Sequence, residues 1–121
     1  MNSFNFGRKV EICGEIYYLK RDMEAIAKAM KKCSDKMIEL SQKKDITQEE
    51  MMGEVTTHSK EAIDTVLGEG AYDRIFAQEE PDLINLVDLV DFITAEINQW
   101  KKELMAKKMA GEELLKKRGK K

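Results

Sequence analysis

The spacing of hydrophobic residues predicts a first long helix over residues 22–43. Apolar side chains recur there at intervals of three and four, at Met23, Ile26, Met30, Cys33, Met37 and Leu40. This spacing is typical of a helix that packs nearly parallel to a partner helix. Asp22 precedes the stripe, and its carboxylate is suited to accept hydrogen bonds from the free backbone N–H groups of the first turn.

A second helix is predicted over residues 47–67. Thr47 is followed three residues later by Glu50, which is a capping-box pattern, and Gly68 is suited to end the helix. The apolar residues on one side of this helix are Met51, Val55, Ala62, Ile63, Val66 and Leu67. The short polar segment before Thr47 separates the two helices.

The third long helix, predicted over residues 81–108, is the most hydrophobic element of the chain. Pro81 suits its first turn, because the N–H group that proline lacks has no partner there. Apolar residues cover more than half of its circumference, at Leu83, Ile84, Leu86, Val87, Leu89, Val90, Phe92 and Ile93. A helix that is apolar on most sides is either the centre of a bundle or leaves one face for a partner. The other helices of so small a chain cannot cover all of it, so we expect an exposed apolar face.

Two shorter elements complete the prediction. A short helix over residues 70–77 should carry Tyr72, Ile75 and Phe76 towards the core. Residues 4–19 are rich in β-branched and aromatic side chains, and the Cys13-Gly14 pair between two apolar runs predicts a β-hairpin. A two-residue loop would place Val10, Ile12, Tyr17 and Leu19 on one face, whereas a three-residue loop would place Ile16 and Tyr18 there. The sequence leaves this register open.

The expected fold is therefore mainly α (α+β), with an N-terminal hairpin followed by a small bundle of three longer helices and one short helix. The chain has 121 residues, which predicts one domain. We place this domain at residues 1–108 and expect residues 109–121 to be a frayed, basic tail.

The charge is unevenly distributed along the chain. Residues 101–121 contain nine Lys or Arg and three Glu, a net charge of +6, so residues 1–100 carry −8 of the total of −2. A basic C-terminus allows an alternative function, that of a small nucleic-acid-binding regulator. The acidic remainder of the chain and the lack of aromatic residues in the tail make nucleic acid the less favoured partner.

Catalytic chemistry finds little support in the sequence. The single His, His58, has no second strong ligand at helical spacing, and Cys13 and Cys33 form no metal-binding or CxxC pattern. No glycine-rich phosphate loop is present, and no apolar run is long enough for a membrane helix. We therefore expect no catalytic, cofactor-binding or metal-binding residues and no association with a membrane.

Three segments resemble, in their order, the small tail assembly chaperones of long-tailed bacteriophages and prophages of low-GC Gram-positive bacteria. These are FNFGRKVEICGEIYYL at residues 4–19, LGEGAYDRIF at residues 67–76, and LINLVDLVDFITAEI at residues 83–97 after the acidic Pro turn. The central segment is the most specific of the three. The resemblance covers residues 4–100 and leaves the Lys-rich tail outside.

The resemblance implies a protein that is not an enzyme. Such chaperones coat the long helical tape measure protein in the host cell cytoplasm, recruit tail tube protein, and are not retained in the mature virion. An uncovered apolar face also favours a homo-oligomer. The expected partner-binding residues are in the short helix and the start of the third long helix, namely Tyr72, Ile75, Phe76, Leu83, Leu86, Val87 and Val90.

Overall fold

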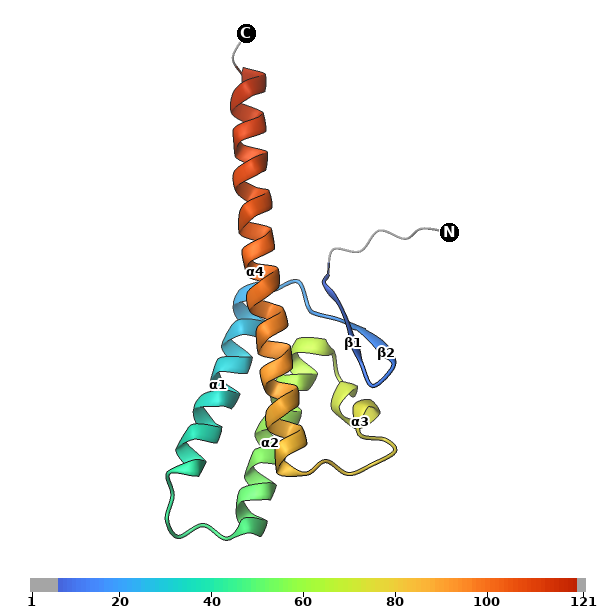
Figure 1. Cartoon of the computed structure of the whole chain (residues 1–121), viewed down its shortest axis with the longest axis vertical. Helices are drawn as coiled ribbons and strands as arrows, with labels where there is room; N and C mark the ends of the chain where they lie inside the picture. The colour runs from blue at the N-terminus through green and yellow to red at the C-terminus, as the bar shows by residue number, and fades with distance from the viewer. Residues whose placement is uncertain (1–6, 120–121) are drawn as a thin grey trace.

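The structure, a computed structural model, describes residues 7–119 of the chain. Within this range it contains a two-stranded hairpin followed by four helices, which confirms the mainly α (α+β) prediction. The helices α1, α2 and α4 form a small bundle, and α4 extends far beyond it (Figure 1). Residues 4–6 of the predicted hairpin lie outside the described residues.

The hairpin pairs β1 (Lys9–Ile12) with β2 (Glu15–Tyr18) in antiparallel orientation. Val10 lies opposite Tyr17, so the loop has two residues, Cys13 and Gly14, whose φ angles are 53° and 79°. Two positive φ angles are typical of the type I′ turn, whose twist matches that of the strands. The register left open by the sequence is thereby decided, and the buried face carries Val10, Ile12 and Tyr17, with Leu19 just beyond β2.

The predicted N-caps of α1 (Met23–Ser41) and α2 (Gln48–Leu67) are confirmed. Asp22 Oδ1 accepts a hydrogen bond from the Ala25 backbone N–H at 3.1 Å, and Thr47 Oγ1 accepts one from Glu50 at the same distance. α1 ends two residues earlier than predicted. α2 ends at Leu67, and Gly68 is its C-cap, as expected, with a φ angle of 115°.

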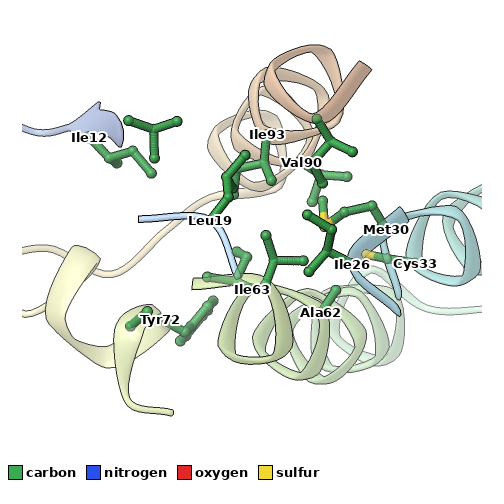
Figure 2. Packing of buried hydrophobic residues seen from close by; sticks show 14 of the residues in the cluster. Ile12, Leu19, Ile26, Met30, Cys33, Ala62, Ile63, Tyr72, Val90 and Ile93 are labelled. Carbon is green, nitrogen blue, oxygen red and sulfur yellow. The ribbon is translucent and has the colours of Figure 1, made fainter. Parts of the chain in front are cut away.

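The core lies where α1, α2 and α4 meet, and the chain after the hairpin closes it from one side (Figure 2). Leu19 points into the centre between these helices, and the backbone N–H of Lys20 donates to the carbonyl oxygen of Val66 at 2.9 Å. The hairpin is thus tied to α2, which supplies the support that an isolated two-stranded hairpin lacks in water. Cys33 and Ser59 are both buried between α1 and α2, where small residues allow a close approach.

α4 (Leu83–Gly119) is longer than the predicted third helix, and α3 (Ala71–Ile75) is shorter than the predicted short helix. α4 begins after Asp82, whose Oδ1 accepts a hydrogen bond from the Asn85 N–H at 2.7 Å, so Asp82 is the N-cap of this helix. Its C-terminal end differs more, because residues 109–119 are helical instead of frayed. Residues 101–118 are mostly Lys, Glu, Leu, Met and Ala, which are strong helix formers. The basic residues of the last turn also interact favourably with the helix dipole.

Candidate partner-binding site

The first half of α4 carries two apolar faces with opposite environments. One face is the core stripe, whose members follow the three-and-four spacing and are all buried: Leu86, Val90, Ile93, Ile97 and Trp100. The other face, which we call the outer row, consists of Leu83, Ile84 and Val87, whose exposed fractions are 39%, 71% and 36%. This helix therefore fills the core and still leaves an apolar row in contact with solvent.

The seven expected partner-binding residues divide between the core and the surface. Leu86 and Val90 are 0% and 1% exposed, and Tyr72 is also buried, so these three are core residues, and a partner on the surface does not reach them. Ile75 and Phe76 are half-buried, and Leu83 and Val87 are exposed. The expectation that Leu86 and Val90 are exposed is wrong, because the interval of four between them belongs to the core stripe.

Two exposed apolar residues in the first half of α4 are not among the expected site residues. Ile84 is the most exposed member of the outer row, and Phe92 is exposed one turn beyond the half-buried Leu89. Both lie off the core stripe. The same three-and-four spacing that predicts the helix over residues 22–43 also picks out the core stripe of α4, and Ile84 and Phe92, which do not fit it, are exposed.

A groove of about 450 Å³ lies where the hairpin, α3 and the start of α4 meet, and we call it the elbow groove. Its apolar lining comes from three elements: Ile12 and Tyr17 of the hairpin, Ile75 and Phe76 at the end of α3, and Leu89 of α4. The rings of Tyr72 and Phe76 contact each other at 4.9 Å between centroids, which fixes the position of Phe76 against the buried Tyr72. The backbone N–H of Tyr72 in turn donates to Asp64 Oδ1 of α2 at 2.9 Å.

The rim of the elbow groove is mainly acidic. Glu15, Glu79 and Glu80 line it, and Arg74 is its one basic residue. Arg74 Nη2 lies 3.5 Å from Glu15 Oε2, and its guanidinium carbon lies 5.1 Å from the centroid of the Tyr17 ring. The Tyr17 hydroxyl donates to Glu15 Oε2 at 3.2 Å, and its pKa is raised, first by burial and then by the bond to this carboxylate. These contacts connect α3 to the hairpin. Among the described residues, Glu79 and Glu80 on the rim form no ion pair.

The second half of α4, residues 101–119, forms what we call the projecting segment. All of its residues are exposed, and it leads away from the bundle (Figure 1). At its base, Arg8 contacts Glu96 and Glu103 with its Nε and Nη1 atoms at 2.7 and 2.5 Å. The hydrogen bond from Gln99 and this contact with Arg8 lower the pKa of Glu103. Arg8 therefore connects the N-terminus of the hairpin to the point where the projecting segment begins.

The two cysteines and the single histidine have different surroundings. Cys13 is exposed at the edge of the elbow groove, whereas Cys33 is buried, and burial raises the pKa of its thiol. His58 is half-buried on α2, with Nε2 3.6 Å from Glu54 Oε2. Among residues 7–119, no group of three or more His, Cys, Asp or Glu side chains is placed to hold a metal ion. In the same residues, no helix has an apolar stretch long enough to span a bilayer.

Comparison with known proteins gives one match. A sequence model of a family of unknown function, DUF6673, matches residues 20–120, which include all four helices of the described structure. No curated protein and no solved structure matches the chain.

Proposed function

This chain belongs to the family of unknown function DUF6673, and we propose that it acts as a non-enzymatic phage tail assembly chaperone. In this proposal it binds the tape measure protein in the host cytoplasm, helps to recruit tail tube protein, and is not retained in the virion. The observation that carries the proposal is the outer row, which α4 leaves exposed although its core stripe is complete.

The outer row has the character of a surface for another helix. Leu83, Ile84 and Val87 lie on one side of α4, and Asp88 and Asp91 beside them are exposed. Contiguous exposed apolar side chains with charged neighbours mark surfaces that bind other proteins. A long helical partner such as a tape measure protein can place an apolar stripe of its own against such a row.

A pull-down experiment with matched variants tests this proposal. The tape measure protein of the same phage or prophage, carrying an affinity tag, is co-expressed with the chain. We expect Ile84→Asp combined with Val87→Asp to abolish recovery of the chain, because two carboxylates would have to be buried without partners in the interface. The control is Ile38→Asp on α1, which changes an apolar residue that is 57% exposed and lies on another element.

The comparison has clear outcomes in both directions. Circular dichroism and thermal unfolding should show that both variants fold like the wild type, because each substitution is made at an exposed position. Recovery of the folded double variant at the wild-type level would reject the outer row as the binding surface. Failure of the wild type to bind the tape measure protein would reject the chaperone function itself.

Nucleic-acid binding is the second candidate function, and the projecting segment is the observation in its favour. Its 19 exposed helical residues include seven Lys or Arg. If this function is correct, the chain binds DNA or RNA with an affinity that falls steeply as salt rises, and replacing Lys107 and Lys108 by Glu weakens the binding. The first half of α4 is acidic and directly precedes this segment in the same helix. Its carboxylates would repel the phosphates of a nucleic acid, which opposes this function.

A further inference from the structure

The two halves of α4 and the elements next to them carry opposite charges. Residues 69–100, which include α3 and the first half of α4, contain eight acidic residues and one basic residue, a net charge of −7. Residues 101–121 carry a net charge of +6. Of the net charge of −8 that residues 1–100 carry, −7 therefore lies directly before the basic end of the chain. Opposite charges of this size attract each other over distances longer than a single contact.

Within one chain, the end of the projecting segment cannot reach the elbow groove. The two halves of α4 follow each other on one continuous helix, and the 19 residues of the projecting segment extend for about 28 Å at 1.5 Å per residue. The segment leads away from α3 and from the start of α4 (Figure 1), whose residues line the elbow groove. In the described part of the chain, its Lys and Arg side chains form no ion pair, and Glu103 pairs with Arg8 just before the hairpin. A neighbouring molecule can supply the acidic surface that the parent chain cannot bring to this segment.

We propose that the elbow groove of one copy of the chain binds the end of the projecting segment of a second copy, so that copies associate head to tail. Leu114 and Leu115 are exposed near the end of the segment, and Lys116, Lys117 and Arg118 follow them directly. The elbow groove offers the complementary arrangement, an apolar floor around Phe76 and Leu89 below an acidic rim. An amphipathic helix that inserts apolar anchors into such a groove is a common mode of peptide recognition.

The size of the elbow groove is consistent with this arrangement. A volume of about 450 Å³ takes a few anchoring side chains rather than the full width of a helix, and it falls within the usual range for binding pockets of about 300–1,000 Å³. Glu79 and Glu80 on the rim are then available to Lys116 and Lys117 of the second copy. Because each copy offers one groove and one segment, the contact is heterologous and produces a ring or an open chain of copies. This inference uses no residue of the outer row and stands apart from the proposed function.

Charge reversal tests the proposal with the full-length protein. The groove variant carries Glu79→Lys and Glu80→Lys, and the segment variant carries Lys116→Glu and Lys117→Glu. Light scattering and sedimentation at low salt should show association of the wild type, and each variant alone should associate at least about tenfold more weakly. An equimolar mixture of the two variants should associate again, because each segment then meets a groove of opposite charge. Raising the salt should weaken the wild-type association, since exposed charges are screened.

A second experiment locates the contact. Cys13 is exposed at the groove, and Gly111 lies one turn before Leu114 and Leu115, where a side chain added to it would meet open space. A short bis-maleimide should cross-link Gly111→Cys of one copy to Cys13 of another, giving dimers and larger species that disappear when Cys13→Ser is added. Ile38→Cys is the matched control, and it should give at least about tenfold less cross-linking.

Each alternative outcome overturns the proposal. A wild type that stays monomeric at low salt and high concentration rejects head-to-tail association. A groove variant that associates as well as the wild type points to pairing between two projecting segments instead. A monomeric protein that binds an oligonucleotide with steep salt dependence assigns the projecting segment to nucleic acid.

Discussion

Two adjacent residues of α4 provide the strictest test of which face of this helix forms the core. Leu86 is 0% exposed, whereas Val87 is 36% exposed. Leu86→Ala truncates a fully buried side chain and should lower the free energy of unfolding by about 2–5 kcal/mol. This loss is the sum of the free energy of transferring the deleted atoms from water into the core and the cost of the cavity they leave. Val87→Ala should change it by less than about 0.5 kcal/mol, because the side chain is partly solvated and Ala is the better helix former.

Urea unfolding followed by the fluorescence of Trp100 measures both effects. Trp100 is the single Trp of the chain and lies buried on the same stripe as Leu86, so its emission reports on the packing of α4. With an m-value of about 2 kcal/mol/M, a loss of about 3 kcal/mol moves the midpoint by about 1.5 M. A chain of 121 residues has a total stability of about 6–18 kcal/mol, so the variant should remain folded without urea. Equal midpoints for the two variants would refute the assignment of the core stripe.

Two further predictions concern the hairpin and the cysteines. Arg8→Gln should lower stability near neutral pH, and the difference from the wild type should shrink on acidification. The pKa of Glu103 is lowered in the folded protein, so this carboxylate stabilises the fold above its ordinary pKa of 4.5 and loses the contribution as the pH falls through the lower folded value. Urea midpoints of both proteins at several pH values measure the difference in stability. A difference that stays constant with pH would contradict the reasoning. A thiol reagent should label Cys13 in the native protein and reach Cys33 only after unfolding, since burial both shields the Cys33 thiol and raises its pKa. Mass spectrometry identifies the labelled residue. Rapid labelling of Cys33 in the native protein would contradict the prediction and show that the interface between α1 and α2 opens.

The sequence predicted the local features of the fold well, because each depends on a few neighbouring residues. Asp22, Thr47 and Gly68 end or begin helices as expected, since capping is a matter of one side chain and the nearest backbone groups. The hairpin register could not be predicted, because both loop lengths place apolar residues on one face. Only the packing of Val10 and Tyr17 against the bundle distinguishes the two.

The surface of α4 was harder to predict than its existence. Eight apolar residues lie close together between Leu83 and Ile93. In such a run, the sequence does not show which apolar side chains face the bundle and which face the solvent. The distinction between Leu86 and Val87 depends on how α4 lies against α1 and α2. The elbow groove could not be predicted at all, since it joins residues of the hairpin, α3 and α4 that are far apart in the sequence.

The length of α4 follows from the same packing that buries its first half. An isolated helix is costly to start in water, because its first turn fixes several residues for a single hydrogen bond. The projecting segment does not bear this cost, because the residues up to Trp100 are already held as a helix by the core, and each further residue only extends it. Stability should therefore decrease from Glu103, which Arg8 holds, towards Gly119. Amide hydrogen exchange should show this gradient in the free protein, and protection should rise towards the C-terminal end when a partner binds there.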